Sequence, residues 1–412
     1  VGGLSVSADH ARSATGVDLT GEERFDVVVR DIATGELLDD QVRGVGYGLE
    51  LSPDGQWLFY TRVDDAWRPY QLWRHRVGGD LAEDVLLHQE DDERFWLGLG
   101  SSRDDRWIML GLGSRTTSEV WLLDATDPAG ELRVVSPRRE GLEYDVEPAG
   151  DRLLVTHNRD NPDMDLAWAP LTATSDADWR PVLSAGPGEH LSGVDAFADF
   201  TVVSLRSNGL PTLRILPRDD ASDTGFGAPR EVHLPGPAGS VGLGDVSEVD
   251  TPSIQVIHES WTLPRSVLEL DVASGSVELL KRQPVLGDFD PGRYAETRIW
   301  ARAEDGTEVP VSVVHRADVT PDGTAPCLLS AYAAYEVSSD PYFSVARLSL
   351  LDRGVVYAVA HARGGGELGR AWYEGGRYAA KVNTFTDVLA AAQDWETFSS
   401  ELGVAIPDTQ MV

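Results

Sequence analysis

The sequence predicts a β-propeller over residues 1–285 followed by an α/β region over residues 286–412. Two observations predict this order. In the first part, a unit of short strands and polar turns recurs about every 45 to 50 residues. In the second part, apolar strands alternate with helical stretches, which is typical of a mostly parallel α/β sheet.

The repeated unit begins with a small or turn-forming cluster and continues into an apolar strand. Ser7 lies 45 residues before Ser52, and Ser52 lies 50 residues before Ser102. Weaker copies near Phe197 and Val246 bring the number of units to about six. A period of this length, made of several short strands, is typical of propeller blades. The alternative is a β-sandwich with a chance spacing of turns. The clear copies are VSADHARSATGVD (6–18), LSPDGQWLFYTRVD (51–64), GSSRDDRWIMLGLG (100–113) and EPAGDRLLVTHNRD (147–160).

The α/β region is expected to begin with a hairpin over 297–316, with Asp305-Gly306 at its turn. We expect the remaining elements in the following order: a strand at 326–332, a helix at 343–354, a strand at 355–362, a helix at 383–400 capped by Asn383 or Thr384, and the start of a strand at 404–412.

Composition excludes several classes of protein. The net charge of −33 argues against binding nucleic acid, which needs a basic face. No apolar run approaches the ~18–20 residues that span a bilayer, so we expect no membrane association. The single cysteine, Cys327, excludes an internal disulfide framework and fits a reducing cytoplasm. The nine histidines show no metal-binding spacing, and we expect no metal.

The stretch RGGGELGR (363–370) contains the pattern G-x-G-x-x-G and raises the question of a dinucleotide site. Its context argues against one. Gly369 leads into RAWYEGGRYAAK, which is poor helix material because of its glycines. Asp387 is expected in the first turn of a helix, and Glu367 would repel a phosphate. We therefore expect no nucleotide and no other cofactor.

A serine nucleophile of the α/β-hydrolase type would need the pattern G-x-S-x-G. None of the serines in the 412 residues has glycine at both −2 and +2. Cys327 lies in an apolar strand with no histidine nearby in the sequence, and we interpret it as a core residue.

Residues 347–392, RLSLLDRGVVYAVAHARGGGELGRAWYEGGRYAAKVNTFTDVLAAA, closely resemble the prolyl oligopeptidase family of serine peptidases, in its oligopeptidase B branch. Three further stretches carry the same resemblance: DLTGEERFDVVVRDIATGELL (18–38), FYTRVDDAWRPYQLWRHRVG (59–78) and VLGDFDPGRYAETRIWARAEDGTEVPVSVVHR (285–316). The resemblance implies a seven-bladed propeller that caps an α/β-hydrolase domain and admits only short peptides.

The resemblance also implies a serine oligopeptidase that cleaves short, basic peptides after Arg or Lys. In the family, the strand that begins here at 404–412 runs into a Gly-Gly-Ser-Ala-Gly-Gly elbow that carries the nucleophile. The aspartate and histidine of the triad follow later. We therefore expect an internal fragment, with a propeller incomplete at its N-terminus, a truncated hydrolase domain, and no activity of its own.

Two site residues follow from the resemblance. Tyr332, in the stretch SAYAAY, matches a family tyrosine whose hydroxyl binds the oxyanion. Ala331 and Ala333 replace two family glycines, and alanine resists positive φ. Asp340 matches an acidic residue near the basic side chains of the substrate, whereas Tyr342 replaces a second acid. A strand-end aromatic and a helix cap are the structural alternatives for Tyr332 and Asp340.

Two other functions remain open. The propeller could act as a non-catalytic peptide-binding or interaction module. The protein could instead belong to a branch of the same family with prolyl or dipeptidyl specificity. The sequence leaves the oligomeric state open.

Overall fold

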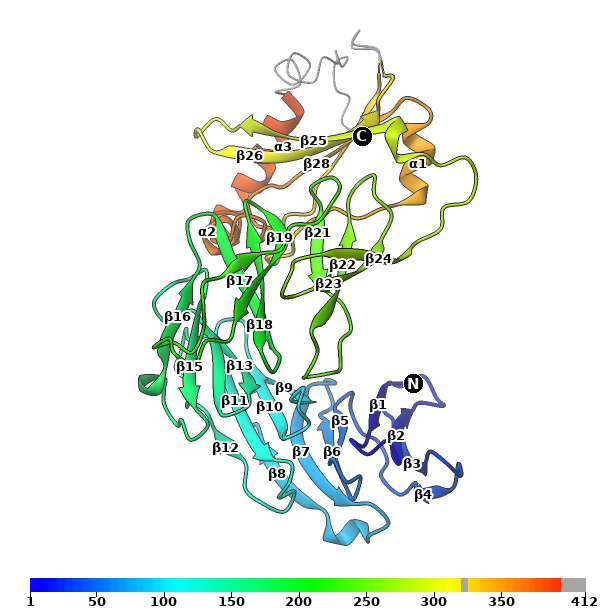
Figure 1. Ribbon diagram of the computed structural model, residues 1–412, viewed down its shortest axis with the longest axis vertical. Helices are drawn as coiled ribbons and strands as arrows, with labels where there is room; N and C mark the ends of the chain where they lie inside the picture. The colour runs from blue at the N-terminus through cyan, green and yellow to red at the C-terminus, as the bar shows by residue number, and fades with distance from the viewer. Residues whose placement is uncertain (320–324, 394–412) are drawn as a thin grey trace.

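The computed structural model describes residues 1–319 and 325–393, and shows a row of β-sheets beneath a smaller α/β layer (Figure 1). These residues form seven four-stranded sheets. In six of them, which follow one another from Gly3 to Arg282, neighbouring strands are consecutive in sequence. This is the arrangement of propeller blades, as the sequence repeats predict, and it excludes a single β-sandwich.

The six blades have the following strands. The first three are β1 (Gly3–Val6), β2 (Arg12–Val17), β3 (Asp26–Asp31), β4 (Leu37–Asp39); β5 (Leu49–Leu51), β6 (Trp57–Val63), β7 (Pro69–Arg76), β8 (Val85–Gln89); and β9 (Trp96–Ser101), β10 (Trp107–Gly113), β11 (Ser118–Asp124), β12 (Arg133–Val134). The next three are β13 (Tyr144–Ala149), β14 (Arg152–His157), β15 (Asp165–Pro170), β16 (Arg180–Ser184); β17 (Glu189–Ala196), β18 (Phe200–Ser207), β19 (Leu210–Pro217), β20 (Arg230–Glu231); and β21 (Ser240–Leu243), β22 (Ser253–Glu259), β23 (Ser266–Asp271), β24 (Val277–Arg282).

A serine turn between the first two strands of a blade accounts for the repeat seen in the sequence. In the second blade, Ser52 Oγ donates to Asp54 at 2.6 Å and accepts from the N–H of Trp57 at 3.0 Å. Equivalent bonds join Ser7 to Asp9 and Arg12, and Ser102 to Asp104 and Trp107. The turn thus uses one hydroxyl to satisfy both a carboxylate and a backbone donor.

Each inner blade packs against both of its neighbours. On β6, Leu58 and Tyr60 belong to a buried cluster shared with the first blade, whereas Phe59 belongs to one shared with the third. Alternate residues of a strand point to opposite faces, so one apolar run serves two interfaces. This explains why β6 and β10, which follow two of the serine turns, are mostly apolar.

The seventh sheet lies above the propeller and has the order β25-β26-β28-β27 (Figure 1). The strand β27 is parallel to β28, and the other two pairings are antiparallel. The elements of this region are β25 (Tyr294–Arg302), β26 (Glu308–Arg316), β27 (Cys327–Ser330), α1 (Val345–Leu351), β28 (Val356–Ala360), α2 (Arg370–Glu374) and α3 (Val382–Gln393). Four short 3₁₀ turns complete the described structure: Leu81–Glu83, Asp176–Asp178, Pro291–Arg293 and Tyr378–Ala380.

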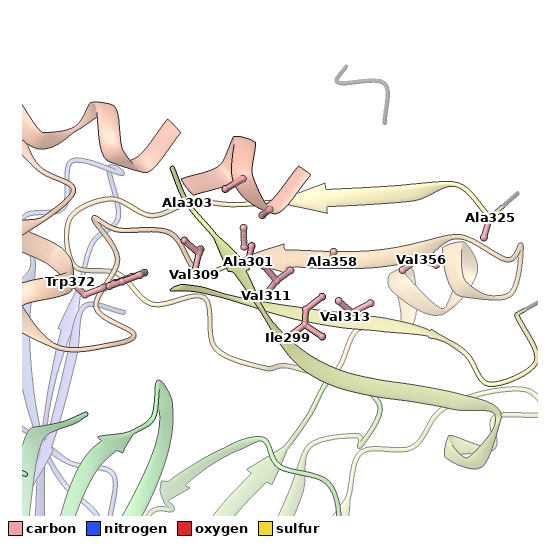
Figure 2. Close-up of a cluster of buried hydrophobic side chains, with 13 residues drawn as sticks. Ile299, Ala301, Ala303, Val309, Val311, Val313, Ala325, Val356, Ala358 and Trp372 are labelled. Carbon is pink, nitrogen blue, oxygen red and sulfur yellow. The ribbon is translucent and has the colours of Figure 1, made fainter. Parts of the chain in front are cut away.

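The two faces of the mixed sheet are covered by different helices. Ala358 of β28 packs in one cluster with Ala391 of α3. Figure 2 shows Ala358 of this cluster together with Ile299 and Val311. Val359, the next residue of β28, packs in a second cluster with Leu351 of α1. The parallel pair β27 and β28 is therefore connected through α1, as in a βαβ unit. No helix among the described residues has the length and apolarity that crossing a membrane requires.

Candidate functional site

Two loops follow the carboxyl ends of the parallel strands β27 and β28. These are residues 331–344 and residues 361–369, and the stretch RGGGELGR ends on Arg370, the first residue of α2. In open α/β sheets, ligands bind outside the carboxyl ends of the strands. The two predicted site residues, Tyr332 and Asp340, both lie on the first of these loops.

The glycines of the second loop allow the two loops to pack backbone to backbone. A Cβ on Gly364 would lie 2.5 Å from the carbonyl oxygen of Ala333, and one on Gly366 would clash with the carbonyl oxygen of Glu336. The N–H of Glu336 donates to the carbonyl oxygen of Gly364 at 3.1 Å. RGGGELGR therefore supports the loop that carries Tyr332 and Asp340.

The first loop has a strained backbone. Ala333, Tyr335 and Glu336 all have positive φ, of +48°, +57° and +64°. Such conformations cost about 1–3 kcal/mol each for residues other than glycine. Ala333 thus adopts the conformation that its glycine counterpart would reach without strain, and Lys381 Nζ donates to its carbonyl oxygen at 2.7 Å. Ala331 is not among the residues with positive φ.

Tyr332 lies one residue past Ala331 and is 57% exposed. Its side chain is therefore not packed in a core, which fits both the predicted role and the strand-end alternative. The exposed position leaves its hydroxyl available to a ligand, and its role in binding an oxyanion stays a prediction.

Asp340 contacts the propeller. Both of its carboxylate oxygens accept from Arg206 at the end of β18, at 2.8 and 2.6 Å. Helix α1 is capped instead by Ser344, whose Oγ accepts from the N–H of Arg347. The helix-cap interpretation of Asp340 is therefore wrong, and its role toward a substrate stays a prediction.

Tyr342, which replaces the second acid, takes part in an aromatic cage around a buried arginine. The guanidinium of Arg347 lies 4.6 Å from the ring centroids of Trp261 and Tyr342, and 4.7 Å from that of Tyr357. Arg347 also donates to the carbonyl oxygen of Tyr342 at 2.8 Å. Cation–π contacts of this kind stabilise a desolvated arginine.

A buried Ser-His-Glu arrangement lies beneath the two loops, and sequence reasoning missed it. Ser312 Oγ lies 2.8 Å from His361 Nε2, and His361 Nδ1 lies 3.3 Å from Glu367 Oε1. The same Glu367 oxygen accepts from the N–H of Ser339 at 2.8 Å. All three side chains are almost fully buried. Because no substrate can reach Ser312 there, we interpret the arrangement as a support for the first loop.

Burial alone would raise the pKa of Glu367, but hydrogen bonds from His361 and Ser339 leave it below its ordinary value. An ionised Glu367 selects the histidine tautomer with its proton on Nδ1. No local sequence pattern could have revealed this group, since Ser312 is 49 residues away from His361.

Two expectations about the glycine stretch need correction. Gly369 does lead directly into a helix, because α2 begins at Arg370, although it ends after five residues. Asp387 does not lie in a first turn, since α3 begins at Val382. It is completely buried and pairs with Arg363, whose Nη2 lies 2.6 Å away. Asp387 thus anchors the glycine loop to α3.

Arg370 connects the glycine loop to the propeller. Its N–H donates to Asp163 at 2.6 Å, and its guanidinium pairs with Glu143 at 2.6 Å and with Glu336 at 2.8 Å. Glu143 and Asp163 lie in loops before β13 and β15 of the fourth blade. The carboxyl ends of β27 and β28 therefore face the propeller.

Cys327 is partly buried and packs against the core cluster of the mixed sheet. Burial raises the pKa of its thiol to about 12, so the reactive thiolate is disfavoured. Within residues 1–319 and 325–393, no three side chains of the histidine, cysteine and carboxylate types come together as a metal site.

Comparison with known proteins identifies relatives over nearly the whole chain. A family model described as "Prolyl oligopeptidase, N-terminal beta-propeller domain" matches residues 1–283. A second, described as "Prolyl oligopeptidase family", matches residues 341–399.

Two curated relatives cover 94% of this chain. One is "Dipeptidyl aminopeptidase BI" of Pseudoxanthomonas mexicana, 37% identical over 392 residues that make up 53% of that protein. The other is "Protease 2" of Moraxella lacunata, 34% identical over 390 residues that make up 55% of it. The chain thus spans about half the length of the curated relatives it matches.

Solved structures give the same answer for the fold. Oligopeptidase B from Leishmania major matches with a TM-score of 0.85 at 31% identity, over 95% of this chain and 56% of that one. Oligopeptidase B from Trypanosoma brucei matches with a TM-score of 0.86 at 30% identity, over 98% of this chain and 56% of that one.

Proposed function

The chain belongs to the prolyl oligopeptidase family, and from this premise we propose that it forms part of a serine oligopeptidase that hydrolyses short peptides after Arg or Lys. In such an enzyme a serine attacks the peptide carbonyl with a histidine as base, and an aspartate orients the histidine. Since none of the 412 residues is a serine in a G-x-S-x-G pattern, we propose that this chain alone does not hydrolyse peptides.

The observation that carries the proposal is the direction in which the two loops face. The loop with Tyr332 and Asp340 follows β27 and contacts the propeller through Arg206. A substrate bound at the carboxyl ends of β27 and β28 would therefore lie between the sheet and the propeller. Such a position favours short, extended peptides over folded proteins, because the propeller covers the approach.

Tyr332 is proposed to donate its hydroxyl to the oxyanion that forms on the scissile carbonyl. A donor placed where charge develops supplies about 2.7–4 kcal/mol of transition-state stabilisation. Its exposure and its position directly after β27 support this role. Asp340 is proposed to attract a basic side chain of the peptide.

A second candidate is a dipeptidyl specificity within the same family. It is favoured by one specific observation: the relative that is 37% identical is named a dipeptidyl aminopeptidase. A third candidate, a propeller that binds basic peptides without turnover, fits the strongly acidic composition. For all three we propose a cytoplasmic location, because one cysteine in 412 residues fits a reducing compartment.

The specificity is tested with the protein translated from the whole reading frame that contains these residues. Its kcat/KM is measured on arginyl, lysyl, prolyl and dipeptidyl chromogenic amides. We expect the arginyl and lysyl amides to exceed the prolyl amide by at least about tenfold, or ~1.4 kcal/mol of transition-state binding. A preference for the dipeptidyl amide would establish the second candidate. Binding of basic peptides with no turnover of any amide would establish the third.

A further inference from the structure

Asp340 is already occupied by a cation of this chain. The two Asp340 oxygens accept from the two terminal nitrogens of Arg206 at 2.8 and 2.6 Å, which is the bidentate geometry of a strong charge-assisted pair. Arg206 is 14% exposed at its side chain, whereas Asp340 is 35% exposed. A ligand arriving from solvent therefore meets the carboxylate more readily than the arginine behind it.

Three other charged groups near this loop also have partners. Glu336 pairs with Arg370, and Glu367 with His361. The buried Arg347 lies in its aromatic cage next to Tyr342. Asp340 is the more exposed of the two carboxylates of this loop, at 35% against 28% for Glu336, and Arg206 is its partner.

We propose that Arg206 is a specificity-determining residue that competes with the basic side chain of a substrate for Asp340. The proposal rests on the proposed function, which assigns Asp340 to a basic side chain. An incoming arginine can reproduce the bidentate geometry only by displacing Arg206 from one or both oxygens. A lysine offers a single point charge and competes less well. Arg206 thus lowers the affinity for basic side chains and favours arginine among them.

The competition also connects substrate binding to the contact between the two parts of the molecule. Arg206 belongs to β18 of the fifth blade, whereas Asp340 belongs to the loop after β27. A basic side chain that takes Asp340 from Arg206 removes one contact between the propeller and the α/β layer. By linkage, a variant without that contact binds the basic side chain more tightly.

The test measures peptide binding to residues 1–412 by fluorescence anisotropy. The probe is fluorescein-Ala-Arg-Arg-Ala-amide, and its analogue contains citrulline, which is neutral and similar in shape to arginine. R206M removes the guanidinium charge and keeps most of the volume. We expect R206M to bind the arginine peptide at least about tenfold more tightly than the unmodified chain, since a hydrogen bond to a charged group contributes ~1.5–3 kcal/mol. The citrulline peptide should bind both proteins equally.

Two further variants identify the cause of any gain in affinity for the arginine peptide. In R206M/D340N the gain should disappear, because the carboxylate that binds the peptide is gone. R214M is the matched control: Arg214 lies on the neighbouring strand β19, is 12% exposed and pairs with Glu189 and Glu231. It should bind the arginine peptide like the unmodified chain.

The proposal is overturned if R206M gains no affinity, if the citrulline peptide gains equally, or if the gain persists in R206M/D340N. Should R206M fail to fold, R206K provides the second measurement, with a gain of several-fold expected and unchanged binding contradicting the proposal. All of these variants are compared by peptide binding to residues 1–412, without any measurement of hydrolysis. A failure of the proposed function would appear separately, as the absence of arginyl-amide hydrolysis by the whole reading-frame product.

Discussion

Glu50 illustrates how one partly buried carboxyl affects the propeller. It lies on β5, the first strand of the second blade, and accepts a hydrogen bond from Ser5 Oγ of the first blade at 3.1 Å. Burial raises the pKa of Glu50 to about 7, despite that hydrogen bond. The folded state therefore disfavours the charged carboxylate, and the free energy of unfolding should depend on pH.

We expect E50Q to stabilise the chain at pH 8 and to leave its stability unchanged at pH 4. Below the unfolded pKa of 4.5, Glu50 is protonated in both states and carries no penalty. Between pH 4.5 and about 7, Glu50 is ionised in the unfolded state but still protonated in the folded state, so the free energy of unfolding falls as the pH rises. Above pH 7 this loss of stability is complete and amounts to at most about 3 kcal/mol. Thermal melts of E50Q and the unmodified chain across this range measure the difference. E36Q, at an exposed turn, is the control for removal of a carboxyl as such, and an equal gain in stability for E50Q at pH 4 would contradict the expectation.

The partners of individual side chains were the features least predictable from the sequence. Tyr332 and Asp340 could be selected only through the family resemblance. Arg206, the partner of Asp340, lies 134 residues away in the fifth blade of the propeller, and no local pattern connects them. The Ser312–His361–Glu367 group was missed for the same reason. Side-chain partners that come together through tertiary contacts leave no periodic signal in one sequence.

At the scale of elements, the glycine loop and the loop after β27 form one unit. Gly366 lies so close to the carbonyl oxygen of Glu336 that a Cβ would clash with it. Gly111 of β10, in contrast, has no atom within 4 Å of the position of a Cβ. Alanine substitutions at Gly366 and at Gly111 therefore separate the effect of close backbone approach from the general effect of adding a methyl group.

We expect G366A to destabilise the contact between the two loops by about 1–3 kcal/mol, the usual cost of overpacking. Hydrogen exchange should then increase at the amide of Glu336, which donates to Gly364. G111A should leave exchange in residues 331–344 unchanged. If exchange there were the same in G366A as in the unmodified chain, the glycines would not be needed for loop packing.

Elements that depend on local chemistry were predictable from the sequence. The serine turns set the spacing of the blades, and Asp305-Gly306 marks the hairpin β25–β26, because both signals depend on neighbouring residues. The alternation of strands and helices after residue 286 predicted β27, α1 and β28 in order. The short helix α2 and the start of α3 at Val382 were not predicted. Asn383 and Thr384, expected as caps, lie inside α3 and donate to the carbonyl oxygens of Gly375 and Arg363, which are contacts that no local pattern reveals.

At the scale of the whole molecule, a few polar side chains connect the α/β layer to the propeller. Arg370 is the most connected of them, with Glu143 and Asp163 on the fourth blade and Glu336 on the loop after β27. Its side chain is 17% exposed. A partly buried charge with this many partners is costly to remove, because the partners are left desolvated.

We expect R370M to weaken the contact between the two parts by about 3 kcal/mol. Calorimetry should then show the α/β layer unfolding at a lower temperature than the propeller. R218M removes an exposed arginine that pairs with Asp220 and Asp151, and it should change stability by less than about 1 kcal/mol. Unchanged thermal unfolding of R370M would show that apolar packing, and not this arginine, joins the two parts.

We propose that these residues form part of a serine oligopeptidase and contain substrate-facing loops without a nucleophile. The most direct measurement treats purified residues 1–412 with a fluorescent fluorophosphonate and follows hydrolysis of an arginyl amide in parallel. We expect no covalent labelling and no turnover above buffer. Labelling of a serine in this chain, together with turnover that the fluorophosphonate abolishes, would contradict it.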